Sequence, residues 1–182
     1  RAASNSGRML GDVLRSLERD RRVKVVEQVR LADERIDCLG CEQCYQTFGY
    51  HGDGIDRVLS LMKKADVILM ATPTCFGMPP ALGVVLLDRL DPLWRDGQQL
   101  KGKLGAVIVN GASNPADDPS VRQCADNMIK FFEQHGMPCV QPVHLGGTLA
   151  YPEQRFPDPL PAGTTGVLER LTDEILRWIG SR

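Results

Sequence analysis

Residues 67–90, VILMATPTCFGMPPALGVVLLDRL, decide the fold of this 182-residue sequence. The first seven residues form a continuous apolar run that ends in Pro73, which is typical of a strand buried on both faces of a parallel sheet. A loop rich in proline and glycine follows, and helical spacing begins near Pro79 and Pro80, where proline suits the first turn. The stretch therefore predicts one strand, loop and helix of an α/β protein.

The rest of the chain repeats this alternation. Further apolar runs predict strands at residues 23–31, 103–113 and 137–146. Helical spacing predicts helices that start at Ser4, Asn5 or Ser6 and at residues 54–66, 79–90, 119–136 and 166–180. Parallel strands need crossover connections, which helices supply. The sequence thus predicts an α/β domain over residues 1–182, with an open, mostly parallel sheet and helices on both faces.

A central strand is expected ahead of the first predicted helix. A doubly wound sheet normally has a strand that feeds the loop before this helix, and without that strand both neighbours would expose apolar surface. We therefore expect a first strand of about eight to ten residues, including its turn, before Arg1.

Composition argues against two classes of partner. A net charge of −1 and a pI of about 6.3 provide no basic face for nucleic acid or for an anionic membrane. No run approaches the ~20 apolar residues that span a bilayer. Six cysteines, three of them within seven positions, do not resemble a secreted disulfide framework. We expect a cytoplasmic protein with reduced thiols that binds a small molecule.

The first predicted helix begins in a segment suited to an anion. The segment offers a guanidinium, an amide and two hydroxyls, from Arg1, Asn5, Ser4 and Ser6. Free backbone N–H groups and the helix dipole both favour a phosphate at a helix N-terminus. Simple N-capping by Ser4 or Ser6 is the alternative interpretation.

Two further loops follow predicted strands. The first has a rigid proline, an apolar ring and a flexible glycine, and its residues are Pro73, Thr74, Cys75, Phe76 and Gly77. The second contains Asn110 and Gly111. Ligands of open α/β sheets bind beyond the carboxyl ends of the strands, where these loops lie. Each loop taken alone is also compatible with a plain turn.

Together these motifs resemble the flavodoxin-like NADPH-dependent FMN reductase family, and within it the branch that includes iron–sulfur flavoproteins. The resemblance extends over most of the chain. Its most specific part is residues 72–77, TPTCFG, which is similar to the family pattern Ser-Pro-x-Tyr-Phe-Gly. Thr72 replaces the serine, and Cys75 replaces the aromatic residue. A helix that carries Asp88 and Arg89 near its end follows, as in the family.

The resemblance implies a flavodoxin-like sheet of order 2-1-3-4-5 and an FMN site. The phosphate would lie on Arg1, Ser4, Asn5 and Ser6, and the isoalloxazine on Pro73, Thr74, Cys75, Phe76 and Gly77 with Asn110 and Gly111 nearby. NAD(P)H would be the cosubstrate, and no side chain is expected to act as a catalytic nucleophile or base. The electron acceptor would be a quinone, a nitro or azo compound, a flavin, a metal ion or a protein. A homodimer or homotetramer is also implied.

Two other functions remain open on the sequence. An electron-transfer flavoprotein would exchange single electrons between FMN and an iron–sulfur cluster or partner. A non-catalytic module would use the same fold to bind a nucleotide or a partner.

The CxxCxxC segment bears on this choice. Cys38, Cys41 and Cys44 have the spacing of cluster ligands, but residues 45–53 supply no fourth cysteine. His51 is the substitute ligand, and a Cys₃His set would also suit zinc. A redox-active thiol pair and cysteines packed as small apolar residues are the remaining alternatives. The preference of clusters and zinc for four ligands favours the metal-free interpretations over either metal.

Overall fold

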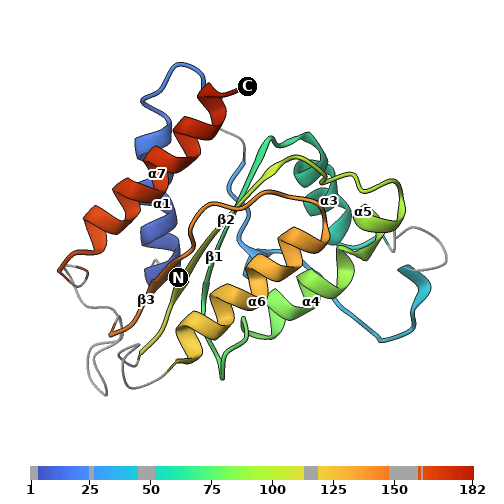
Figure 1. The fold of residues 1–182 in the computed structure, drawn as a ribbon. Coiled ribbons are helices and arrows are strands. Elements are labelled where there is room, and N and C mark those ends of the chain that lie inside the picture. Colours follow the sequence, from blue (N-terminus) through green and yellow to red (C-terminus); the bar gives the residue numbers. More distant parts are fainter. Residues whose placement is uncertain (1–3, 25–26, 45–51, 113–118, 148–159, 161) are drawn as a thin grey trace.

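The fold centres on a parallel sheet. The computed structural model describes residues 4–24, 27–44, 52–112, 119–147, 160 and 162–182. Three parallel strands, β1 (Val67–Pro73), β2 (Leu104–Asn110) and β3 (Val143–Leu145), form one sheet in the order β1-β2-β3 (Figure 1). β1 pairs with β2 along its whole length, whereas β3 pairs only with the last three residues of β2. The carboxyl ends of all three strands therefore lie at the same edge.

Helices cover both faces of this sheet (Figure 1). On one face lie α1 (Asn5–Leu17) and α7 (Thr164–Gly180). On the other lie α3 (Ile55–Lys64), α4 (Ala81–Arg89) and α6 (Ser120–Gln134). Two short elements complete the described structure, a 3₁₀ turn η1 (Leu31–Asp33) and the helix α5 (Asp91–Arg95).

β2 forms the centre of both hydrophobic cores. All seven of its residues are buried. Ala106 and Ile108 pack into the core with α1 and α7, whereas Val107 and Val109 pack into the core with α3, α4 and α6. Side chains of a strand alternate between faces, so a continuous apolar run is stable only where both faces are covered. The predicted α/β architecture with a parallel sheet and helices on both faces is thereby confirmed.

The predicted strand at residues 23–31 is wrong for the residues that are described. Glu27–Arg30 run as irregular chain and residues 31–33 form η1. A strand needs a neighbour to accept its ladder hydrogen bonds, and this segment lies along the outside of β1 without pairing to it. Val23, Val29 and Leu31 instead pack against the cores from the edge.

The last predicted strand is shorter than expected. The pattern over residues 137–146 yields only β3, with an isolated bridge between Gly105 and Cys139. Pro138 and Pro142 lack the N–H that a ladder requires, so pairing is interrupted before Val143. Among the described residues the sheet therefore has three parallel strands, and the order 2-1-3-4-5 stays a prediction. No helix among them has the length and apolarity needed to cross a bilayer.

Candidate functional site

Hydrogen bonds join the three predicted ligand loops at the carboxyl edge of the sheet. The Ser6 hydroxyl at the start of α1 donates to Oδ1 of Asn110 at the end of β2, at 2.5 Å. The Thr74 N–H after β1 donates to the Asn110 carbonyl at 2.9 Å. Ser6 and Asn110 are 5% and 4% exposed, so the Ser6–Asn110 bond is shielded from water. Asn110 thus ties the first loop to the second.

The N-terminus of α1 is capped as the simpler interpretation predicted. Ser4 has extended backbone angles, and its hydroxyl accepts from the Gly7 N–H at 3.1 Å. The first turn carries no acidic residue, so the positive end of the helix dipole is not offset within α1. Asn5 is buried beside it. Arg1, predicted to contact the phosphate, lies outside the described residues.

A tight turn presents Phe76 at the same edge. The Cys75 N–H donates to the Met78 carbonyl at 2.7 Å, and the Met78 N–H donates to the Cys75 carbonyl at 3.0 Å. Phe76 and Gly77 have φ of +50° and +78°, which is the type I′ geometry. A positive φ is costly for a residue with a bulky side chain. Phe76 is nevertheless 98% exposed at the tip, so no packing of its ring within the described residues compensates for this strain.

One face of α6 supports this turn, and the sequence analysis missed it. Asn127 Nδ2 donates to the Gly77 carbonyl at 3.2 Å, and Thr74 Oγ1 donates to the Ser120 carbonyl at 3.3 Å. A Cβ at Gly77 would lie 2.6 Å from Gln123 Oε1. Positions 120, 123 and 127 share one helix face. The sequence did contain one signal for this support, because three polar residues at that spacing lie on the helix that was predicted to follow the Asn110 loop.

Gly111 permits the close approach of two loops. A Cβ at this position would lie 2.5 Å from Val121 Cγ2 and 3.2 Å from Thr74 Cγ2. The Gly111 N–H donates to the Leu145 carbonyl at 2.9 Å, which connects the site to β3. The glycine predicted at this edge therefore has a steric role in the structure.

Two ionisable side chains near this edge, those of Cys124 and His144, have shifted pKa values. Burial raises the pKa of the Cys124 thiol, and a hydrogen bond with Thr74 offsets part of this effect. Burial and the charge of Arg122 lower the pKa of His144 on β3, and Asp126 partly opposes them. Both shifts favour the neutral forms of these two side chains.

The chemistry of these groups suits a planar, anionic ligand. A helix N-terminus with a serine cap can receive an anion, and an exposed aromatic ring on a constrained turn can contact a planar ring. The residues that the structure describes thus fit FMN, with Ser4, Asn5 and Ser6 at the phosphate end and Thr74, Cys75, Phe76 and Gly77 at the ring end. Pro73 ends β1 beside them, and Asn110 and Gly111 lie between the two groups.

The described part of the cysteine segment does not assemble a set of metal ligands. Cys38 and Cys41 are exposed, and Cys44 is partly buried. Within the described ranges, no three Cys, His, Asp or Glu side chains gather in a way that could hold a metal ion. Glu42 has a φ of +56° between Cys41 and Gln43. His51, the proposed substitute ligand, falls outside the described residues.

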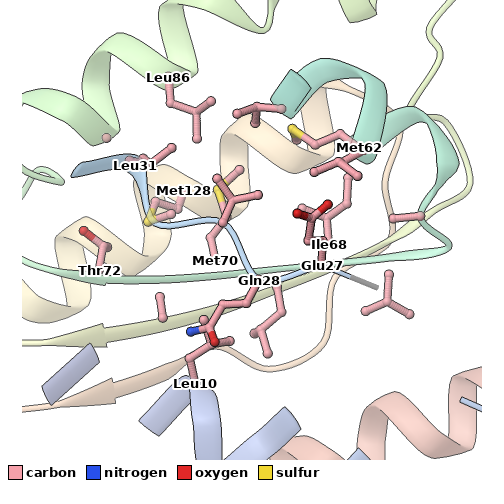
Figure 2. Close-up of a pocket in the computed structure, with 18 of the residues that line it drawn as sticks. Leu10, Glu27, Gln28, Leu31, Met62, Ile68, Met70, Thr72, Leu86 and Met128 are labelled. Carbon is pink, nitrogen blue, oxygen red and sulfur yellow. The ribbon is translucent and has the colours of Figure 1, made fainter. Parts of the chain in front are cut away.

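A separate cavity of about 440 Å³ lies along the outer edge of β1, and we call it the edge groove. Figure 2 shows Leu10 of α1 on one side of β1 and Leu86 and Met62 on the other. The groove includes Thr72 and Pro73 but none of Ser4–Ser6, residues 74–77 or Asn110. Because its walls are almost entirely apolar, it offers no anion site, and we do not identify it with the ligand loops.

Comparisons with known proteins agree with this geometry. The family described as NADPH-dependent FMN reductase matches residues 1–146. An iron-sulfur flavoprotein of Methanocaldococcus jannaschii is 35% identical over 133 residues, which cover 67% of this chain and 64% of the relative. The match thus spans slightly less than two thirds of that relative's length.

Solved structures show the same fold at low identity. The apo form of an NADH:FMN oxidoreductase superposes with a TM-score of 0.69 at 15% identity, covering 100% of this chain and 84% of the other. A flavodoxin, WrbA-like protein from Agrobacterium tumefaciens gives 0.58 at 17% identity, covering 95% and 90%. The α/β fold is therefore flavodoxin-like.

Proposed function

Because the chain belongs to the NADPH-dependent FMN reductase family, we propose that it binds FMN at the carboxyl edge of its sheet and reduces an acceptor with electrons from NAD(P)H. The observation that carries this proposal is the Asn110 junction. Its side chain holds Ser6 at the start of α1, and its carbonyl holds Thr74 at the start of the next loop. A phosphate site and a ring site are thereby fixed relative to each other.

Each described loop has a distinct part in this function. FMN, when bound, supplies the ring that accepts a hydride from nicotinamide. The N-terminus of α1 holds the phosphate through backbone N–H groups, with Ser4, Asn5 and Ser6 around it. Residues 74–77 support the ring, and the preformed turn places Phe76 without a further ordering cost. The acceptor is a small molecule such as a quinone, a nitro or azo compound, or free flavin.

The first test is direct. The purified protein is titrated with FMN, and binding is followed by quenching of flavin fluorescence. The complex is then mixed anaerobically with NADPH or with NADH, and the flavin absorbance is recorded. We expect saturable one-to-one binding and rapid bleaching by at least one nicotinamide. A protein that binds no FMN would be a non-catalytic module instead.

A second candidate is an electron-transfer iron–sulfur flavoprotein. Two observations favour it, the name of the M. jannaschii relative and the CxxCxxC spacing of Cys38, Cys41 and Cys44. Iron, zinc and acid-labile sulfide measured on anaerobically purified protein distinguish the candidates. Stoichiometric iron and sulfide with slow bleaching by NADPH would select the second candidate. Bound flavin without iron would select the FMN-dependent reductase. We favour this candidate because a cluster prefers four protein ligands and the segment supplies three cysteines.

The edge groove bears on the full strand order. Its walls belong to helices on both faces of the sheet, and its floor is the outer edge of β1. A further extended strand beside β1 would have the position of strand 1 in the order 2-1-3-4-5. We propose that such a strand occupies the groove, because the apolar walls suit a strand buried on both faces.

We also propose self-association. Phe76, Met78, Leu82 and Trp94 are exposed apolar residues on or near α4 and α5. Exposed apolar side chains favour an interface where a partner can cover them. A homodimer or homotetramer would cover them, and sedimentation of the FMN-loaded protein checks this.

A further inference from the structure

A backbone hydrogen bond joins the two chain segments on either side of the cysteines. The Gly54 N–H donates to the Arg35 carbonyl at 2.7 Å. A Cβ at Gly54 would lie 3.0 Å from both the backbone nitrogen and the carbonyl oxygen of Arg35, so glycine permits this contact. We call Arg35, Asp37, Asp53 and Gly54 the neck. The chain leaves the core through Asp37, carries the three cysteines and returns through Asp53.

Arg89, the last residue of α4, bonds both sides of the neck. Its Nη1 donates to the Asp37 carbonyl and, at 2.9 Å, to Oδ2 of Asp53, and its Nη2 donates to Oδ1 of Asp53 at 3.3 Å. The Arg89 side chain is 5% exposed, and its Nε has no hydrogen-bond partner among the described residues. A guanidinium forks to several acceptors in fixed geometry, which an ammonium cannot do. One side chain thus fixes a backbone carbonyl from one segment and a carboxylate from the other.

Asp53 also bonds the start of the next helix. The Ile55 N–H donates to Oδ1 of Asp53 at 3.0 Å, and Ile55 is the first residue of α3. The carboxylate therefore connects α4, the neck and the start of α3.

We propose that Arg89 is a positioning residue that closes the neck and holds the cysteine segment against the end of α4 through protein groups alone. The other end of α4 begins at the Pro80 cap, two residues after the Phe76 turn. A helix of nine residues is rigid over its length of about 14 Å. The cysteine segment and the predicted flavin loop are thus attached to opposite ends of one short helix.

Hydrogen exchange of the full chain, measured by mass spectrometry, tests this inference. The informative amides are those of Gly54 and Ile55, which are bonded to Arg35 and to Asp53. We expect Arg89→Met to speed their exchange by about tenfold or more, because both sides of the neck lose their common partner. Arg89→Lys should restore part of the protection, since an ammonium keeps the charge but reaches fewer acceptors. Arg95→Met is the matched control, because Arg95 forms an exposed pair with Asp91.

Two further arms keep the test decisive. Asp53→Asn should speed the same amides even if Arg89→Met fails to fold, and the double variant should add little, because the two residues act as one unit. Treatment of the parent protein with a chelator should leave both amides unchanged. Unchanged exchange in Arg89→Met and Asp53→Asn, or a chelator effect as large as that of Arg89→Met, would overturn the proposal. Exchange of β2 amides serves as the measure of intact folding.

Discussion

The two loops attached to α4 are built in different ways. The loop before α4, residues 74–78, is held along its length by Ser120, Asn127 and Asn110, and it keeps a strained turn with Phe76 exposed. The cysteine segment after residue 37 is held at its neck, where Arg89 bonds both sides. The first loop is therefore organised before any ligand arrives, whereas the second is held at its ends and exposes Cys38 and Cys41.

The largest effect should come from Gly111, where the first of these loops approaches α6. In Gly111→Ala the new methyl would lie 2.5 Å from Val121, which is closer than atoms pack. We expect a loss of about 1–3 kcal/mol in unfolding free energy, typical of overpacking, together with weaker FMN binding. Urea unfolding and FMN titration measure the two effects. Gly166→Ala, at a helical position with open space around it, should leave FMN binding unchanged and raise the unfolding free energy by up to about 1 kcal/mol through helix propensity. Equal losses in the two variants would contradict the steric argument.

The next effect concerns the Asn110 junction. Asn110→Ala removes the acceptor of the buried Ser6 hydroxyl, and such a loss costs about 1–3 kcal/mol. FMN affinity should fall by more than stability alone explains, because the phosphate and ring ends lose their fixed spacing. Thermal unfolding and fluorescence titration provide the two readouts. A double-mutant cycle of Asn110→Ala with Ser6→Ala isolates the interaction between these two residues. Additive losses of unfolding free energy would show that the two loops are not coupled through this bond.

A substitution of Phe76 should change protein stability and FMN affinity in opposite directions. Phe76→Asn places Asn-Gly, the preferred type I′ pair, in the turn. We expect unfolding free energy to rise by about 0.5–1 kcal/mol as the positive-φ strain is relieved, while FMN affinity falls because the apolar ring is lost. Denaturant midpoints and FMN titration check both signs. Unchanged FMN affinity would show that Phe76 does not contact the ligand.

The sequence predicted the parts of this molecule that depend on local pattern. The apolar run of β2 and the N-cap at Ser4 follow from burial on both faces and from hydroxyl chemistry, and both are observed. Residues 23–31 also contain recurring valines and a leucine but have no pairing partner among the described residues, because pairing is a property of the sheet rather than of the segment.

Long-range contacts in the site were not predictable in the same way. The Asn127 bond to Gly77 and the Arg89 bonds to the neck join residues 50 and 36–52 positions apart. A single sequence contains no signal for such pairs beyond the polar character of the residues. The loops themselves were predicted because strand ends at one edge of a parallel sheet must lie together.

The smallest predicted effect is the response of the neck to acid. The pKa of Asp53 lies below its ordinary value of 3.8, because the bonds from Arg89 and Ile55 outweigh the effect of burial. A carboxylate with a lowered folded pKa contributes stability that is present above its unfolded pKa of about 4 and is lost as pH falls through the folded pKa. The parent should therefore exceed Asp53→Asn in unfolding free energy at pH 6, and the difference should shrink below pH 4. Asp91→Asn, which removes an exposed pair with Arg95, should show little difference at either pH. If the Asp53→Asn difference did not shrink at all as the pH fell below 4, the carboxylate would not be the charged group that holds the neck, and the contrast between the two loops would need another cause.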